Sequence, residues 1–464
     1  MPCSLSQSAP EDVFPYHQLD SLDSECTVLA ERAKHIVIQG IQKLPTEILC
    51  EIFRSAVPAQ ARNSPPIRVR APRTQRGPWK LLSPWSLGQV CGRWRAVALS
   101  LPSLWTSISI YTHLSARELF LIQMQLERSR DAPLVILIRC MYECKEKLAF
   151  DTLVREYLVL SSLRWRRLEF IARTGHSDPA IFHFILLRPM PLLQELISDP
   201  WDHYYSYLAN AGSPNLVRIV AGRYRLVPWG WDRLVAFRAL CSGAAYTFLE
   251  RLLAAANLVE CDIRTWASRS KLLRIAEAPM LTLPHLRRLA VNKSVFLRYL
   301  DLPALQELHV EGQITDVLPC LHRSTCPLRR LSLVHCTATH TDVARLLRAA
   351  PSLTTLEIDF LWSHWSTADL RALIAVLTIP DGRCPGVQEC ASTCLCPLLT
   401  ALSWGDRTAE MDCAAFVDMV HAHRRAAIDN ERCEHSPLLS VGIYLGGAGM
   451  RAYGRWMQWM GVLA

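Results

Sequence analysis

Apolar residues recur at helical spacing in two segments near the start of the chain, residues 41–53 and 85–105. Each segment therefore predicts an amphipathic helix with one broad apolar face. In the first segment, Pro45 suits the opening turn of a helix and Glu47 suits its positive end. The apolar face of the first helix consists of Ile48, Leu49, Ile52 and Phe53, and that of the second consists of Leu87, Val90, Cys91, Trp94 and Ala98.

Strand-like and helix-like patterns alternate through the rest of the chain. Residues 107–111 and 132–140 predict strands, with an amphipathic helix between them. A Leu-x-x-apolar-x-apolar template then recurs, with 18 to 28 residues between successive copies in the middle of the chain. Copies begin at Trp165, Leu193, Leu216, Leu234, Leu258, Leu286, Leu305, Leu328, Leu353, Leu399 and Leu438. Amphipathic helices lie between several copies, as at 246–256 and 340–350.

This organisation predicts the α/β fold class: a small all-α module, then an irregular solenoid of strand–helix units with the leucine-rich-repeat period. The copies lack the regular asparagine of standard repeats. We expect an acidic segment with an amphipathic helix at 1–40, the helical module at 41–110 and the repeats at 111–464. The amphipathic helix, at 22–33, packs on the adjoining helical module or belongs to a coiled-coil dimer. A Pro-rich insert at 58–80 splits the helical module.

Three short sequences in the helical region carry a family resemblance: Leu-Pro-x-Glu-Ile-Leu at 44–49, Val-Cys-x-x-Trp-Arg at 90–95 and Leu-Trp at 104–105. Together they resemble an F-box, which would cover residues 41–110. With the degenerate repeats behind it, the chain is similar to the F-box and leucine-rich-repeat proteins abundant in mushroom-forming fungi. It departs from them in the 23-residue insert and in Gly88 and Gly92, each of which weakens a helix by about 1 kcal/mol relative to alanine.

The resemblance implies a substrate-recognition subunit of an SCF-type (cullin-RING) ubiquitin ligase. The F-box would dock on a Skp-type adaptor, and through it on a cullin, while the repeats bind an unknown target protein. The chain would then be a monomer within a larger complex and not an enzyme. The adaptor contacts that the resemblance implies are Leu44, Pro45, Glu47, Ile48, Leu49, Ile52, Phe53, Val90, Cys91 and Trp94, with Arg93 and Trp105 as further family marks.

Two alternatives stay open for the same residues. The apolar face of the first helix is either excess surface for a partner or only the core of a helical hairpin. In the second case the chain is a non-catalytic leucine-rich-repeat scaffold whose F-box does not support degradation. Ubiquitin transfer belongs to other subunits under either interpretation.

Polar residues that flank the buried positions of each repeat strand are expected on the concave face. These positions are Arg218, Glu260, Asp262, Arg288, Asn292, Glu307, His309, Glu311, Arg330, Glu357 and Asp359. Those taken as target contacts are Glu260, Asp262, Arg288, Glu307, His309, Arg330, Glu357 and Asp359. Acids outnumber bases six to three in the longer set, so we expect a protein target with mixed or basic charge rather than a phosphate backbone.

The composition indicates where the protein acts and which kinds of partner it binds. Half of the 464 residues are hydrophobic, but no apolar run approaches the roughly 18 residues that cross a bilayer, and the start lacks a secretion-signal pattern. We expect a protein of the cytoplasm, the nucleus or both, with its 17 cysteines mostly reduced. The net charge of +9 is dispersed, so we do not expect a nucleic-acid partner. The six-base, acid-free insert is a solvated loop, or it touches an acidic partner or nucleic acid.

Other candidate sites fit their chemistry poorly. Cys384, Cys390, Cys394 and Cys396 have spacings that do not suit a tetrahedral zinc site, and His421, His423, Cys433 and His435 form a second weak set. Gly447, Gly449 and Ala452 match a dinucleotide motif, but the following helix, second strand and acid are missing. No P-loop, G-x-S-x-G or H-E-x-x-H sequence stands in a plausible context. We expect no metal, no cofactor and no active site.

Overall fold

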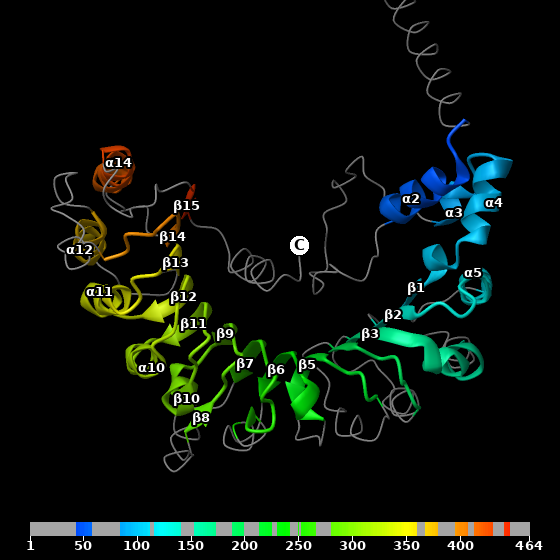
Figure 1. Ribbon diagram of the computed structural model, residues 1–464, viewed down its shortest axis with the longest axis horizontal. Helices are drawn as coiled ribbons and strands as arrows, with labels where there is room; N and C mark the ends of the chain where they lie inside the picture. The colour runs from blue at the N-terminus through cyan, green and yellow to red at the C-terminus, as the bar shows by residue number, and fades with distance from the viewer. Residues whose placement is uncertain are drawn as a thin grey trace, which may run out of the picture. The chain divides into compact units, whose positions relative to one another are not determined.

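The structure is a computed structural model of the chain (Figure 1). It describes residues 43–57, 84–111, 116–140, 153–172, 188–198, 213–224, 230–241, 249, 252–265, 280–359, 367–378, 395–406, 413–429 and 440–445. These residues belong to two compact units: the first ends at Leu104 and the second begins at Trp105. The helix expected at residues 22–33 and the basic insert at 58–80 lie outside the described residues.

The first unit is helical. It contains α2 (Thr46–Ala56), α3 (Pro84–Leu87) and α4 (Gly92–Ser100), and the chain leaves it through the short 3₁₀ helix η1 (Pro102–Trp105). Helix α4 packs against both α2 and α3. Pro45 stands immediately before α2 rather than in its first turn, while Glu47 lies in the first turn as expected. We call this unit the helical module.

The second unit is built on one large parallel sheet. Thirteen strands pair in parallel and follow one another in chain order, and two more strands, β8 and β10, pair separately. The strands are β1 (Ser107–Tyr111), β2 (Leu134–Cys140), β3 (Trp165–Ala172), β4 (Glu195–Ser198), β5 (Arg218–Tyr224), β6 (Ala236–Cys241), β7 (Glu260–Thr265), β8 (Leu281–Thr282), β9 (Arg288–Val291), β10 (Leu300–Asp301), β11 (Glu307–Gln313), β12 (Arg330–Thr337), β13 (Thr355–Asp359), β14 (Ala401–Asp406) and β15 (Ser440–Leu445).

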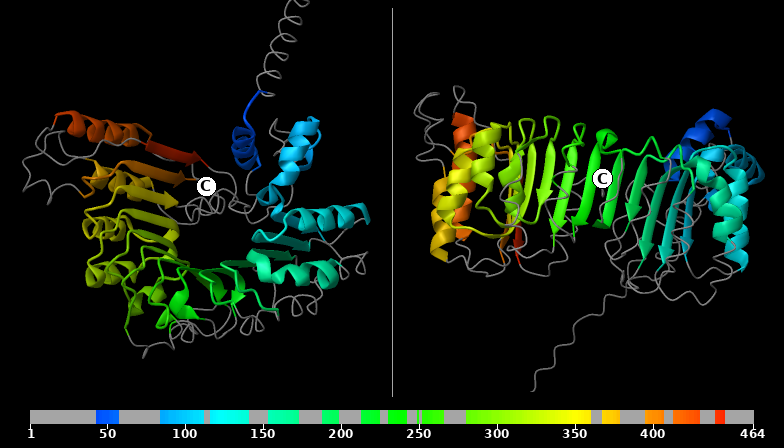
Figure 2. Two further views of the ribbon diagram at one scale, coloured as in Figure 1. Left: turned by 45° about the vertical axis from the view of Figure 1, so that its right-hand side comes forward. Right: turned by 90° about the horizontal axis from the view of Figure 1, so that it is seen from below.

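Helices and helical turns connect the strands. They are α5 (Ala116–Arg128), η2 (Leu153–Leu158), η3 (Val159–Arg164), η5 (Trp231–Arg233), η7 (Ser294–Tyr299), α10 (Val317–Ser324), α11 (His340–Arg348), α12 (Thr367–Leu377) and α14 (Cys413–Asp429). Helices α10, α11, α12 and α14 lie on one side of the sheet (Figures 1 and 2). Across the described residues, no helix combines the length and the apolar character that a membrane crossing needs.

Every copy of the sequence template coincides with a strand of the large sheet. Copies from Trp165 through Leu438 lead into β3 to β7, β9 and β11 to β15. The register aligns equivalent template positions: Leu289, Leu308, Leu331 and Leu356 are paired across β9, β11, β12 and β13. The strand–helix order predicted for residues 107–140 is also present, as β1, α5 and β2.

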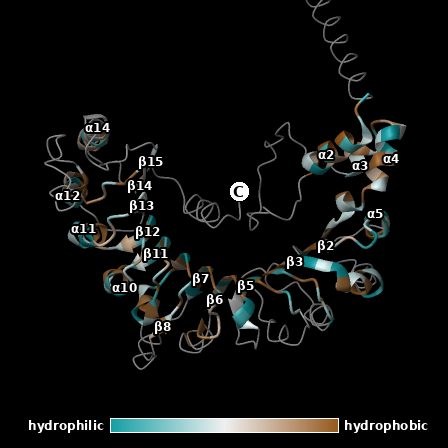
Figure 3. Cartoon of the chain, in the orientation of Figure 1, coloured by the Kyte–Doolittle hydropathy of each residue, from teal (hydrophilic) through white to brown (hydrophobic). Residues whose placement is uncertain are grey.

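Two-residue alternation divides each strand between two faces. The aligned leucines are fully buried and belong to one core with Val343, Leu346 and Leu347 of α11 and Leu373 of α12. Residues at the intervening positions therefore point away from these helices. Hydrophilic and hydrophobic residues both occur on the helices (Figure 3), and those of α11 that are buried are apolar. We call the face away from the helices the polar face of the sheet.

Side-chain hydrogen bonds connect neighbouring turns, each of which precedes a strand of the sheet. The side chains of Asn215, Arg233 and Asn257 donate to the carbonyls of Pro191, Pro214 and Asp232, at 2.6 to 2.7 Å. In each case a turn reaches the turn before the preceding strand. Two of these donors are asparagines, although the copies lack the regular asparagine of standard repeats. These surface hydrogen bonds tie neighbouring turns together without a strict repeat sequence.

The aligned leucine core generates a stability prediction. Changing the fully buried Leu331 to Ala removes packed methyl groups from a site where neighbours on both adjacent strands cannot collapse. The free energy of unfolding should fall by about 2–5 kcal/mol. The same change at Leu253, which is 51% exposed, should alter it by no more than about 0.5 kcal/mol. Urea unfolding followed by circular dichroism measures both, and equal losses would contradict this account of the core.

Candidate functional site

Helix α2 divides its apolar residues between the interior and the surface. Leu49 and Phe53 are fully buried, and the Phe53 ring meets the Trp94 ring of α4 edge-to-face at a centroid distance of 4.9 Å. Ile48 and Ile52 are 47% and 41% exposed. Because these two isoleucines are four residues apart, they occupy the same face of the helix. The helix therefore presents an apolar surface that the described residues of its own module leave exposed.

The segment expected to form a single second helix is broken in two, so that prediction is wrong. Helix α3 ends at Leu87, and α4 begins at Gly92 with the side chain of Cys91 accepting a hydrogen bond from the Trp94 amide at 3.4 Å. Arg95 donates to the carbonyl of Gly88 at 2.8 Å. Two glycines weaken the helix here, and Cys91 and Arg95 satisfy main-chain groups that the break releases.

The break changes the role of the residues beside it. Val90 stands in the turn between α3 and α4, and its side chain is 60% exposed. Arg93 donates to the carbonyl of Leu44, just ahead of α2, and so ties the start of α2 to α4. This bond is a structural role for a residue known from the resemblance only as a family mark.

The ten expected adaptor contacts thus fall into three groups. Leu49 and Phe53 are core residues of the module. Three are half-buried: Leu44, Cys91 and Trp94. Five are exposed: Pro45, Glu47, Ile48, Ile52 and Val90.

The second unit holds the expected target contacts on the polar face of the sheet. All eight, together with Arg218 and Glu311, alternate with buried residues of their strands and lie on this one face. Asn292 differs, because it follows β9 and its side-chain amide bonds both the N–H and the carbonyl of Thr265 at 2.8 and 2.9 Å. That amide extends the pairing between β7 and β9 instead of facing a partner.

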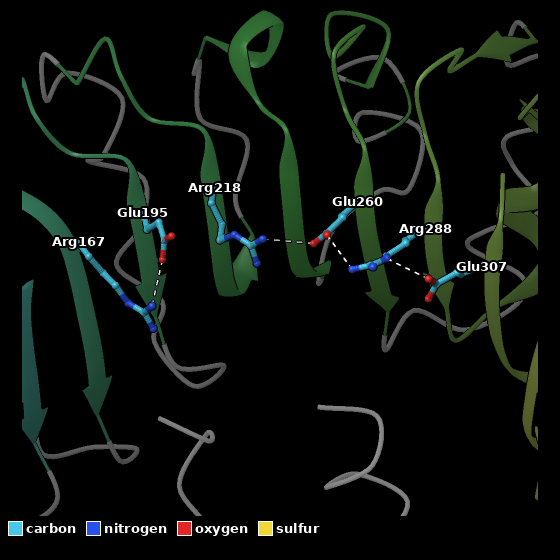
Figure 4. Close-up of polar contacts among 6 residues, drawn as sticks. All are labelled: Arg167, Glu195, Arg218, Glu260, Arg288 and Glu307. Atoms are coloured by element: carbon cyan, nitrogen blue, oxygen red, sulfur yellow. Dashed lines mark hydrogen bonds and ion pairs between the residues drawn. The ribbon is translucent and has the colours of Figure 1, made fainter. Parts of the chain in front are cut away.

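Charges alternate along one row of the polar face. Register pairs Arg167, Glu195, Arg218, Ala236, Glu260, Arg288, Glu307 and Arg330 in succession across neighbouring strands. Ion pairs join Arg167 to Glu195 at 3.1 Å, Glu260 to Arg288 at 3.0 Å and Arg288 to Glu307 at 3.2 Å (Figure 4). Arg218 reaches past Ala236 to Glu260 at 3.4 Å. Strands about 4.8 Å apart bring such side chains into direct contact.

A second row lies deeper. Asp262 is fully buried, with its carboxylate 3.0 Å from Arg238 and 3.7 Å from Arg264. Burial raises the pKa of Asp262, and the two guanidinium groups oppose that rise. Arg264 also lies 3.8 Å from Glu311. Because the acid is enclosed by its own arginines, it supports the face and contributes little surface to a partner.

His309 is buried beside this cluster. Its Nδ1 is 3.0 Å from the Ser332 hydroxyl, which donates to Glu357 at 3.1 Å. Since the hydroxyl hydrogen goes to Glu357, the Nδ1–H of His309 donates to Ser332. Burial, with Arg264 and His335 acting in the same direction, lowers the pKa of His309 to about 3. The imidazole is therefore neutral at physiological pH.

Six charged residues of this face were missed by the sequence reasoning: Arg139, Arg167, Glu169, Glu195, Arg238 and Arg264. Arg167, Glu195 and Arg238 stand at template positions equivalent to residues that were selected, and Arg264 follows the copy that begins at Leu258. The signal was therefore present in the template register. With these residues included, the acid excess expected for the face is largely balanced by arginines.

The weaker candidate sites are mostly outside the described residues. Cys384, Cys390, Cys394, Cys433, His435 and the Gly447–Gly449–Ala452 motif all lie there. Of the rest, Cys396 is buried in the main core, His421 is exposed, and His423 bonds the Leu377 carbonyl at 2.7 Å. Within the described part of the chain, no group of three or more His, Cys, Asp or Glu residues is arranged to hold a metal ion.

The geometry of the helical module agrees with a family comparison. Residues 41–111 match the F-box-like family model. The chain thus carries an F-box-like domain, which spans the helical module and ends at the last residue of β1. F-box domains generally bind Skp-type adaptors, and this one suggests an adaptor role in ubiquitin ligase complexes. No curated protein matches the chain.

The packing of the F-box-like domain generates a prediction about α2. Phe53→Ala removes the ring that contacts Trp94 and should destabilise the domain by about 3–5 kcal/mol. Ile52→Ala, on the exposed face of the same helix, should cost less than about 1 kcal/mol. Hydrogen exchange of α2 and α4 amides, read by mass spectrometry, reports on this domain alone. Loss of protection in the Ile52 variant but not in the Phe53 variant would reverse the assignment.

The buried histidine generates a pH prediction. Because the folded-state pKa of His309 is about 3 against an ordinary 6.5, its contribution to stability is present above pH 6.5 and is lost as the pH falls toward 3. Acidification over this range should destabilise the wild-type protein more steeply than His309→Asn, by up to about 1.4 kcal/mol per pH unit. Urea unfolding at several pH values measures the two slopes. Parallel slopes would mean that His309 accepts a proton in the fold.

Proposed function

We propose that this chain is the substrate-recognition subunit of an SCF-type ubiquitin ligase. The F-box-like domain docks on a Skp-type adaptor, and through it on a cullin, and the second unit holds the target protein. The observation that carries the proposal is the exposed apolar face of α2, with Ile48 and Ile52, inside a region that matches the F-box-like model. A small helical module keeps such residues at its surface at a cost that a partner's apolar surface removes.

The proposal assigns different roles to neighbouring residues of one helix. Leu49 and Phe53 hold α2 on α4, so they act on the adaptor contact only through the shape of the module. Ile48 and Ile52 meet the adaptor directly, and Val90 adds a third apolar side chain from the turn before α4. Glu47 and Pro45 are exposed at the start of α2 and border the contact.

We further propose that the second unit is an irregular leucine-rich-repeat solenoid, of the kind found in F-box proteins of mushroom-forming fungi. Support comes from the coincidence of each template copy with one strand of a parallel sheet in chain order. Its polar face is the target-binding surface. The chain itself carries out no chemistry: it supplies proximity and orientation, and transfer of ubiquitin belongs to other subunits.

Adaptor docking is tested by charge substitution on the exposed face of α2. Ile48→Asp and Ile52→Asp should each lower the affinity for a purified Skp-type adaptor at least about tenfold, because the carboxylate loses its water in an apolar contact. Leu253→Asp, a matched change at a similarly exposed residue of the second unit, should bind as the wild type does. Isothermal titration calorimetry gives the affinities, and circular dichroism confirms that each variant is folded.

Either of two results would overturn this proposal. One is unchanged adaptor affinity in both isoleucine variants, and the other is the absence of adaptor binding by the folded wild-type chain. In the second case the chain would act as a repeat scaffold without a ligase connection.

A further inference from the structure

The charges of the polar face are not evenly distributed along the sheet. On β5, β6, β7 and β9, four arginines accompany two carboxylates: Arg218, Arg238, Arg264 and Arg288 with Glu260 and Asp262. On β11, β12 and β13, four carboxylates accompany one arginine: Glu307, Glu311, Glu357 and Asp359 with Arg330. These two groups of strands are neighbours in the sheet. We call them the arginine strip and the carboxylate strip.

The side-chain exposures in the arginine strip favour its positive charge. The side chains of Arg218 and Arg288 are 35% and 37% exposed, while those of Glu260 and Asp262 are 16% and 0% exposed. Arg218 and Arg288 are thus the outer groups of this strip, while Arg238 and Arg264 are 15% and 22% exposed. The carboxylate of Asp262 lies 3.0 Å from Arg238 and has no exposed surface to offer a partner. A partner approaching this strip meets guanidinium groups first.

The other polar residues of the carboxylate strip add little positive charge to offset its carboxylates. His309 is buried and neutral, and the Ser332 hydroxyl is uncharged and donates a hydrogen bond to Glu357. Glu311 keeps 34% of its side chain exposed. Arg330 is the only described cation among the three strands' polar-face positions, and it lies 3.9 Å from Glu307. Arg330 is 39% exposed against 20% for Glu307, so the negative sign of this strip rests on its net charge of four carboxylates to one arginine.

We propose that the polar face recognises a protein segment with two opposed charge blocks, acidic residues against the arginine strip and basic residues against the carboxylate strip. This inference rests on the proposed function only in taking the polar face as the target-binding surface. Complementary charges of this kind fix the orientation of a partner and reject segments that carry the blocks in other arrangements.

Strand geometry sets the spacing of the two blocks. With neighbouring strands about 4.8 Å apart, the centres of the strips lie roughly 17 Å apart across the sheet. An extended peptide advances about 3.4 Å per residue, so the block centres should be separated by about five residues. A suitable probe is therefore a fluorescein-labelled octapeptide with three glutamates, a Gly-Ser linker and three lysines.

The experiment measures fluorescence anisotropy of this block probe with the full-length chain, at low and at physiological ionic strength. The matched control probe has the same composition with glutamate and lysine alternating. The block probe should bind about tenfold more tightly than the alternating probe at low salt, and the difference should shrink as salt screens the charges. All-glutamate and all-lysine octapeptides complete the set, and both should bind more weakly than the block probe.

Variants locate the binding on the protein. Arg218→Gln and Arg288→Gln should each weaken the block probe several-fold, since each removes an outer cation of the arginine strip. Arg348→Gln, on the exposed surface of α11 on the other side of the sheet, should leave affinity unchanged. Circular dichroism shows whether each variant keeps its fold.

Several results would overturn the inference: equal affinity of the block and alternating probes, tighter binding of a single-sign probe, no measurable block-probe binding at millimolar concentration, or an equal loss in the Arg348 variant. Any of these, with adaptor binding intact, rejects the charge-block partner and leaves the proposed function standing. Selective block-probe binding by a chain that fails to dock on the adaptor rejects the proposed function and leaves the charge-block inference standing.

Discussion

The second unit depends on one constraint, the in-register parallel pairing of successive template copies. A shift of a single residue between two strands would move every leucine to the polar face and every charge into the core. Leu289, Leu308, Leu331 and Leu356 show the constraint in its simplest form, since paired positions on four strands are all fully buried. The side-chain bonds between turns reinforce the same register, because each fixes a turn at the height of its neighbour.

The same register produces the charge pattern of the polar face. Arg288 sits between Glu260 and Glu307 only because these three residues occupy equivalent template positions on adjacent strands. Individually, ion pairs that keep contact with solvent contribute little to stability, roughly 0–1 kcal/mol each. Their consequence is orientation: the guanidinium and carboxylate groups are held in fixed places. A face whose charged groups are held in fixed places discriminates between partners better than one with flexible charges.

Within the F-box-like domain the central feature is that α2 has one buried apolar face and one exposed apolar face. Phe53 and Leu49 bury against the module, and their neighbours Ile48 and Ile52 are consequently turned outward. Helical geometry allows both outcomes on adjacent residues, because successive side chains are about 100° apart. The break at Gly88 then places Val90 on an exposed turn instead of on a helix. Cys91 and Arg95 make the break compatible with the fold.

The amino-acid sequence was enough to predict the features that depend on short segments or on periodic spacing. The template spacing predicted where the strands lie, the apolar spacing predicted α2, and the short motifs at 44–49 and 90–95 indicated the F-box, because these signals depend only on neighbouring residues. Which residues of α2 are buried was decided by tertiary packing, since Trp94 reaches Phe53 from another helix. Tertiary structure alone also brings the opposite charges of the polar face into contact: Arg238 and Asp262 are 24 residues apart in the chain, and only the pairing of β6 with β7 brings them to 3.0 Å.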